Sequence, residues 1–139
     1  MISIIAMETL PSILDYGQVI QAMENHPNNV FLQRDGCWLL SYLADSIRDE
    51  LALQSRSFTV LVAAMNTFPE DERVLLGGCT AIMNVAGPRG GGRGKAARKA
   101  GSTDAVKMAC EYFKKAGKDD QFEVCKKGLL RMNKNCIIM

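Results

Sequence analysis

The most reactive side chains in this chain are five thiols and one imidazole: Cys37, Cys79, Cys110, Cys125, Cys136 and His26. No two cysteines form a Cys-x-x-Cys pair and no cysteine lies near His26 in sequence, so the spacing does not favour a zinc site. With a single imidazole, neither a Ser/His/Asp nor a Cys/His arrangement can be completed. We therefore expect no enzyme activity, no metal and no cofactor, and we expect four of the five cysteines to be small core residues.

The last four residues, Cys136-Ile137-Ile138-Met139, fit the C-a-a-X prenylation motif. In that reaction the cysteine thiolate attacks an isoprenoid diphosphate, and a terminal methionine favours the farnesyl group. A patch of upstream cations could meet an anionic membrane as a second anchoring signal: Lys126, Lys127, Arg131 and Lys134. The alternative is that these four residues are only the apolar end of the last helix.

Residues 90–96 (GGGRGKA) resemble a phosphate-binding loop but lack its spacing. That motif would need glycine where Arg89 stands and serine or threonine where Ala96 stands. The basic segment Arg89–Lys99 could instead contact nucleic-acid phosphates, although it offers no aromatic ring for base stacking. Nucleic-acid binding is therefore the alternative function, and an inter-repeat loop is the simplest interpretation of 87–94.

The net charge of +2 hides two oppositely charged regions. Residues 1–86 carry four basic and ten acidic side chains, a net charge of −6, whereas residues 87–139 carry thirteen basic and five acidic ones, a net charge of +8. No apolar run approaches the roughly 20 residues of a membrane span, and Met1–Ala6 lacks the basic residues of a signal peptide. We expect a cytoplasmic protein that can also lie at a membrane surface.

The strongest pattern is an internal repeat at a spacing of 42 residues. Residues 19–44 (VIQAMENHPNNVFLQRDGCWLLSYLA) and 61–86 (LVAAMNTFPEDERVLLGGCTAIMNVA) align without a gap. The identical pairs are Ala22/Ala64, Met23/Met65, Pro27/Pro69, Gly36/Gly78, Cys37/Cys79 and Ala44/Ala86. Such a register indicates two copies of one structural unit.

Each unit divides at its proline into two helices. The first helix is predicted over 18–25 and 58–68, and the second over 29–44 and 71–86, where apolar residues follow a 3.6-residue period. The residues after Pro27 and Pro69 offer side-chain oxygens for helix capping. Gly36 and Gly78 stand in the middle of a helix, where glycine costs about 1 kcal/mol against alanine, so we expect a neighbouring helix to pass too close for a β-carbon. A short connecting helix is predicted over 45–55.

A third, degenerate copy follows the glycine-rich stretch, and Gly128-Leu129-Leu130 matches Ala81-Ile82-Met83 at a spacing of 47. The chain is thus divided into units of about 15–44, 45–86 and 94–133 within one helical domain over 1–133, with the loop 87–94 between units and a tail over 134–139. Three units are about the minimum for a repeat domain. Because the apolar end faces of so short an array can stay uncovered, self-association through these faces is a further expectation.

HPNNVFLQRDGCWLLSYLA, with its Gly-Cys-Trp and closing Leu-Ala, resembles the armadillo repeat, especially the regular 42-residue type. The resemblance is good over 17–86 and weaker to residue 133. It implies an all-α fold, a right-handed α-solenoid of about three repeats, and a concave groove lined by the third helix of each unit. It also implies an adaptor or scaffold that binds a peptide or protein partner in that groove.

Members that read basic nuclear-import signals carry a Trp and, four residues later, an Asn on the third helix. In this chain Tyr42 stands at the Asn position four residues after Trp38, and Thr80 stands at the Trp position four residues before Asn84. Each unit therefore holds half of the pair. The groove positions implied by the resemblance are Arg34, Trp38, Tyr42, Thr80, Asn84, Lys127 and Arg131. With those cations it would suit an acidic or mixed peptide; the alternative for Trp38 is a core aromatic residue.

Overall fold

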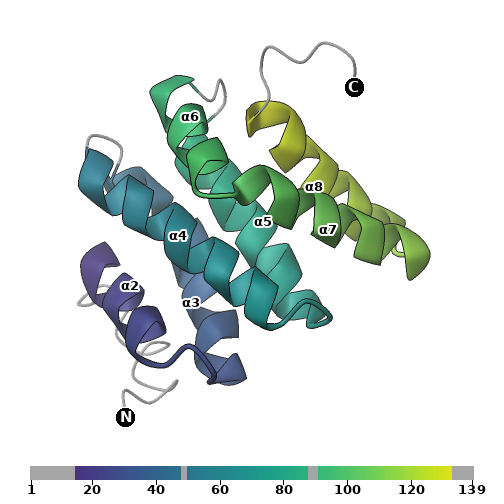
Figure 1. The fold of residues 1–139 in the computed structure, drawn as a ribbon, viewed down its shortest axis with the longest axis horizontal. Helices are drawn as coiled ribbons and strands as arrows, with labels where there is room; N and C mark the ends of the chain where they lie inside the picture. The colour runs from purple at the N-terminus through teal and green to yellow at the C-terminus, as the bar shows by residue number, and fades with distance from the viewer. Residues whose placement is uncertain (1–14, 48–49, 88–90, 133–139) are drawn as a thin grey trace.

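The computed structural model describes residues 15–47, 50–87 and 91–132, and these segments contain helices and no strand. In chain order the elements are α2 (Tyr16–Asn25), α3 (Val30–Tyr42), the 3-10 helix η1 (Ala44–Ile47), α4 (Leu51–Thr67), α5 (Glu72–Ala86), α6 (Gly91–Lys99), α7 (Ser102–Lys115) and α8 (Asp119–Met132) (Figure 1). The predicted all-α class is confirmed. The side chains of residues 91–94 and 131–132 are not described.

Short polar side chains start three of the helices: α3 and α5, as the sequence indicates, and also α2. The Asp15 side chain accepts a hydrogen bond from the Gln18 backbone N–H at 2.8 Å, and the Asp15 backbone N–H donates to Gln18 Oε1 at 3.0 Å. Asn29 caps α3 by accepting from Leu32 N–H, and Asp71 caps α5 by accepting from Val74 N–H. Each cap satisfies a backbone donor that has no partner within its helix.

The helices pack as hairpins in two layers. α2 packs on α3, α4 on α5, and α7 on α8. Within one layer α5 lies between α3 and α8, and within the other α4 contacts α2, α6 and α7; Figure 1 views the second layer in front of the first. α5 is therefore the central helix that joins the N-terminal hairpins to the C-terminal one.

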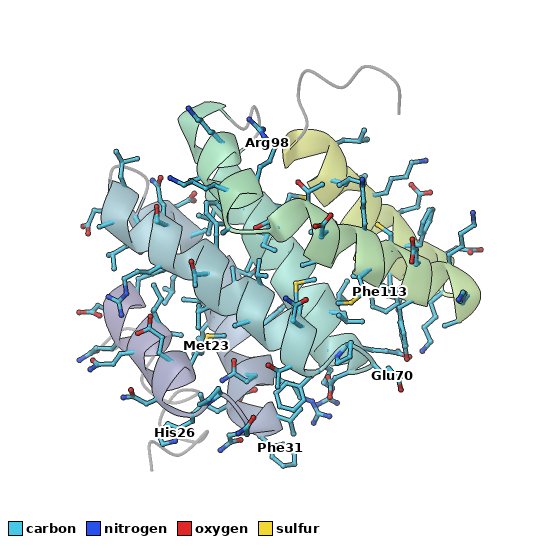
Figure 2. All side chains as sticks on the ribbon, viewed as in Figure 1. Met23, His26, Phe31, Glu70, Arg98 and Phe113 are labelled. Atoms are coloured by element: carbon cyan, nitrogen blue, oxygen red, sulfur yellow. The ribbon has the colours of Figure 1, made fainter. Side chains whose placement is uncertain are left out.

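The two mid-helix glycines have the same packing role. A β-carbon on Gly36 would lie 2.5 Å from Met23 Sδ, and one on Gly78 would lie 2.7 Å from Met65 Cγ. Both methionines are almost fully buried, and they too stand 42 residues apart. The expectation of a close approach is confirmed: in each hairpin a methionine of the first helix lies across the glycine of the second (Met23 is labelled in Figure 2).

The connection between the first two hairpins differs from the prediction. Instead of a short helix over 45–55 followed by a second from 58, residues 44–47 form a 3-10 turn and α4 runs unbroken from Leu51 to Thr67. The stretch from Leu51 to Phe58 contains no Pro or Gly to end a helix. Gln54 and Ser57 are buried on its inner face, and Gln54 Nε2 donates to the Ile47 carbonyl at 2.9 Å.

The glycine-rich segment differs as well. The predicted loop 87–94 is wrong over its second half, because α6 begins at Gly91. Its alanines explain the helix: Ala97 is fully buried and Ala96 half-buried, and alanine has the highest helix propensity. Gly87 (φ 79°) ends α5 and Gly101 (φ 91°) separates α6 from α7, both in the left-handed region that glycine adopts without strain.

Candidate functional site

Three aromatic side chains of α3 are exposed to solvent, namely Phe31, Trp38 and Tyr42. Trp38 is 61% exposed and Tyr42 is 78% exposed. They stand four residues apart on the helix, while Cys37 and Leu40, on its other side, are fully buried. The alternative of a core role for Trp38 is therefore wrong, and the two rings form an exposed aromatic ridge.

Asn84 of α5 lies beside this ridge and is held by α3. Its Nδ2 donates to the Ser41 carbonyl at 3.1 Å and lies 3.4 Å from Ser41 Oγ. These bonds orient the amide between the two helices, at the level of Tyr42.

A hollow of about 440 Å³ opens at this place, and we call it the aromatic hollow. Its lining residues are Trp38, Ser41, Tyr42, Ala44, Asp45, Asn84 and Gly87. Of the seven predicted groove residues, the structure thus brings Trp38, Tyr42 and Asn84 together. The hollow lies where α3 passes into the 3-10 turn and α5 ends at Gly87.

The sequence prediction missed Ser41, Ala44, Asp45 and Gly87. A signal for one of them was present: Trp38, Ser41 and Tyr42 are spaced i, i+3 and i+4, which places them on one face of α3, whereas Asp45 belongs to the 3-10 turn that follows. Ala44 and Gly87 carry no such signal, because their position depends on how the helix ends are arranged in space.

Arg34 forms an ion pair inside the chain. Its Nη2 lies 2.6 Å from Asp71 Oδ2, its Nε donates to both carboxylate oxygens, and its guanidinium lies 5.3 Å from the Phe31 ring centre. Burial acts to raise the pKa of Asp71, but the hydrogen bonds from Arg34 and from the Val74 N–H outweigh it, so the pKa is lowered. Arg34 therefore braces α3 against the start of α5 and is less available to a ligand.

The other predicted groove residues lie away from the aromatic hollow. The Thr80 hydroxyl donates to the Leu76 carbonyl at 2.8 Å, within its own helix. Lys127 is exposed on α8; Arg131 belongs to the same helix, but its side chain is not described. Cys136 and Lys134 of the tail, and Arg89 of the basic segment, lie outside the described residues.

The described cysteines are packing residues. Cys37, Cys79, Cys110 and Cys125 are buried free thiols, which confirms their predicted core role. Burial raises the pKa of Cys37 to about 12, and hydrogen bonding to Cys125 together with burial raises the pKa of Cys110. Such thiols stay protonated at neutral pH and are weak nucleophiles.

Among the described residues, no group of three or more His, Cys, Asp or Glu side chains is placed to hold a metal ion. Within the same segments, no helix has the length and apolar character needed to cross a bilayer. Comparison of the chain with protein families, with characterised proteins and with solved structures found no match.

Proposed function

We propose that this chain is an armadillo-type repeat protein, a right-handed α-solenoid of about three units, which acts as a non-enzymatic adaptor. In this proposal an extended peptide segment of a protein partner binds along α3, α5 and α8. The observation that carries it is the aromatic hollow, where exposed Trp38 and Tyr42 stand beside the oriented amide of Asn84.

The repeat architecture is supported by equivalent environments at equivalent positions. Leu32 and Val74 are both fully buried, as are Cys37 and Cys79, and the methionine–glycine packing occurs in both hairpins. Helical hairpins of matching interior that stack side by side are the arrangement expected of repeat proteins.

The exposed aromatic ridge supports a binding role on physical grounds. Large rings left in water forgo the free energy that their burial would release, and aromatic residues are enriched among the residues that dominate binding energy. The amide of Asn84 offers hydrogen-bonding atoms to a peptide backbone next to these rings. Together these groups provide an apolar anchor point with a polar contact alongside.

The charge expected of the bound peptide follows from the charged side chains at and near the aromatic hollow. Arg34 is neutralised by Asp71, and among the described residues that line the hollow the charged one is Asp45. Exposed Lys127 lies one helix further along the layer. We therefore expect a mixed peptide, with an apolar side chain in the aromatic hollow and acidic residues toward α8.

Trp38 is the chain's one tryptophan and thus reports directly on the hollow. The test is to select peptides from a random displayed library on the folded protein and to titrate them while following Trp38 fluorescence. In the double variant Tyr42→Ala/Asn84→Ala we expect affinity to fall about tenfold to a hundredfold, as for the loss of a binding hot spot. Leu51→Ala, which removes a 72% exposed side chain from α4, is the matched control and should bind as the wild type does.

Selected peptides that leave Trp38 fluorescence unchanged and bind the double variant equally well would show that the hollow is not the binding surface. Far-UV circular dichroism of each variant verifies that the helices are intact.

We also propose that Cys136 carries a farnesyl group. The support is the C-a-a-X pattern alone, with the cysteine sulfur forming a thioether as diphosphate leaves. Mass spectrometry of the protein made in eukaryotic cells should find the added isoprenoid, and Cys136→Ser should lack it. An unmodified Cys136 would remove this part of the proposal.

A further inference from the structure

The cations of α6 are gathered on one face of the helix. Lys95, Arg98 and Lys99 are exposed and spaced i, i+3 and i+4, whereas Ala97 is fully buried on the opposite side. That buried side packs against α4, α5, α7 and α8. The sequence of α6, GGRGKAARK, contains no acidic residue, so its outward face is purely cationic.

The hairpin of α7 and α8 adds charge of the same sign at one of its ends. Because the two helices pack along their length as a hairpin, the start of α7 adjoins the end of α8. Exposed Lys107 lies in the first half of α7, and exposed Lys126 and Lys127 lie in the second half of α8. The acidic residues within one helical turn of them are Asp104, Glu111 and Glu123.

The other end of the hairpin mixes signs. There Lys114 and Lys115 close α7, and Asp119, Asp120 and Glu123 open α8. The positive charge of this region is therefore concentrated where α6 meets the end of α8. Figure 1 shows these two elements at the same end of the molecule, and Figure 2 labels Arg98 there.

We call this surface the basic end: Lys95, Arg98, Lys99, Lys107, Lys126 and Lys127. One exposed apolar residue accompanies it, since Leu130, 37% exposed, follows Lys126 and Lys127 by four and three residues on the same face of α8. A lysine-rich surface with an aliphatic side chain among the cations has the composition of a membrane-surface contact.

We infer that the basic end docks on an anionic lipid bilayer. Lysines attract acidic headgroups from within a Debye length of the surface, and Leu130 can enter the headgroup region. A nucleic acid is less well suited, because the described residues of this end include no exposed aromatic ring for base stacking. The docking needs no peptide in the aromatic hollow and no lipid on Cys136; a farnesyl group would add a second anchor to it.

The test uses the full chain with its unmodified Cys136 thiol, made in bacteria, and co-sedimentation with vesicles. We expect binding to vesicles of phosphatidylcholine with phosphatidylserine, little binding to phosphatidylcholine alone, and loss of binding as salt is raised. Lys95→Glu/Lys99→Glu should reduce the bound fraction about tenfold or more, because each cation near the surface contributes several-fold.

Lys114→Glu/Lys115→Glu is the matched control, since it changes net charge by the same amount at the mixed end of the hairpin. It should retain most of the binding. If the Lys95/Lys99 variant does not fold, Lys126→Glu/Lys127→Glu tests the α8 part of the basic end independently. Circular dichroism verifies the fold of each variant.

Equal losses in the Lys95/Lys99 and Lys114/Lys115 variants would show that net charge, not this surface, controls binding and would overturn the inference. So would an absence of binding to anionic vesicles, or displacement of the vesicles by single-stranded RNA at equal phosphate concentration. Peptide binding at the aromatic hollow is measured separately by the Trp38 titration without vesicles. Lys127 belongs to both proposed surfaces, and the deciding Lys95/Lys99 and Lys114/Lys115 variants leave it unchanged.

Discussion

Residues 15–86 and residues 91–132 build their hairpins by the same rules but present opposite surfaces. The N-terminal region places a methionine across a glycine in both of its hairpins and exposes aromatic rings on α3. The C-terminal region has Cys125 where a spacing of 47 would put the equivalent of Gly78, and it fills its interior with Phe113, which is fully buried. Its exposed residues are mainly lysines and acids.

The comparison shows that interior and surface vary separately along this chain. Interior positions are mainly apolar in all three hairpins, so the helices can stack throughout; the buried polar residues are Gln33, Gln54, Ser57 and Ser102. The net charge of the sequence changes from −6 over 1–86 to +8 over 87–139. A single stacked domain can thus carry an aromatic binding surface and a cationic one without either altering the core.

The largest expected effect tests whether the two regions form one cooperative unit. Phe58 of α4 and Phe113 of α7 are both fully buried, and replacing either by alanine should cost about 3–5 kcal/mol of unfolding free energy. Because α5 packs against both α3 and α8, we expect each variant to unfold in a single transition in urea, followed by circular dichroism. Two separated transitions for Phe113→Ala would show that the regions fold independently.

The second prediction concerns the methionine–glycine packing of the N-terminal region. Gly78→Ala places a β-carbon 2.7 Å from Met65, and we expect a net loss of about 1 kcal/mol, overpacking outweighing the gain in helix propensity. Gly17→Ala is the matched control: its β-carbon would have ordinary contacts at 3.5 Å, so it should gain about 0.5–1 kcal/mol. Urea titration measures both, and a gain in both would mean that the close approach is not a constraint.

A smaller effect is expected at the ion pair that joins the first two hairpins. Because Asp71 has a lowered pKa in the folded protein, its pairing stabilises the fold above its ordinary pKa of about 3.9 and is lost as pH falls through the lower folded value. The stability difference between wild type and Arg34→Ala should thus be constant near neutral pH and shrink below about pH 4. A difference that stays constant down to pH 2 would assign the effect to lost packing on Phe31 instead.

The smallest effect is expected at the ion pair that joins the N-terminal to the C-terminal region. Lys118 Nζ lies 2.7 Å from Glu72 Oε1, and the Tyr112 hydroxyl lies 3.1 Å from Glu72 Oε2. Both charged side chains are about two-fifths exposed, so solvent screens the pair. Lys118→Ala should leave the urea midpoint almost unchanged. A loss as large as that of Phe113→Ala would show that the regions are joined by charge and not by the packing of α5 on α8.

Much of the fold could be predicted because its signals are local or repeated. Asn29 and Asp71 mark helix starts by their side chains, and the spacing of 42 identifies the matching glycines and buried positions. The start of α4 and the existence of α6 could not be predicted in the same way. The start of α4 has no side-chain cap, and α6 is held by the buried Ala97 and by contacts with four other helices.

The site was predictable in part for a related reason. The helical position of Trp38 and Tyr42 follows from the sequence, but the proximity of Tyr42 to Asn84 depends on how α3 and α5 pack. Asp71 shows the limit most clearly. Its capping role is local and was visible, whereas its pairing with Arg34, 37 residues away in sequence, required the folded arrangement.

The two methionines that lie across glycines also offer a chemical measure of how often each N-terminal hairpin opens. Peroxide converts a thioether to a sulfoxide, and the side chains of Met23 and Met65 are almost fully buried in the folded hairpins. We therefore expect oxidation of either sulfur to depend on local opening of its hairpin. The relative rates at the two sulfurs, read by peptide mapping, would report how often each hairpin opens while the rest of the molecule stays folded.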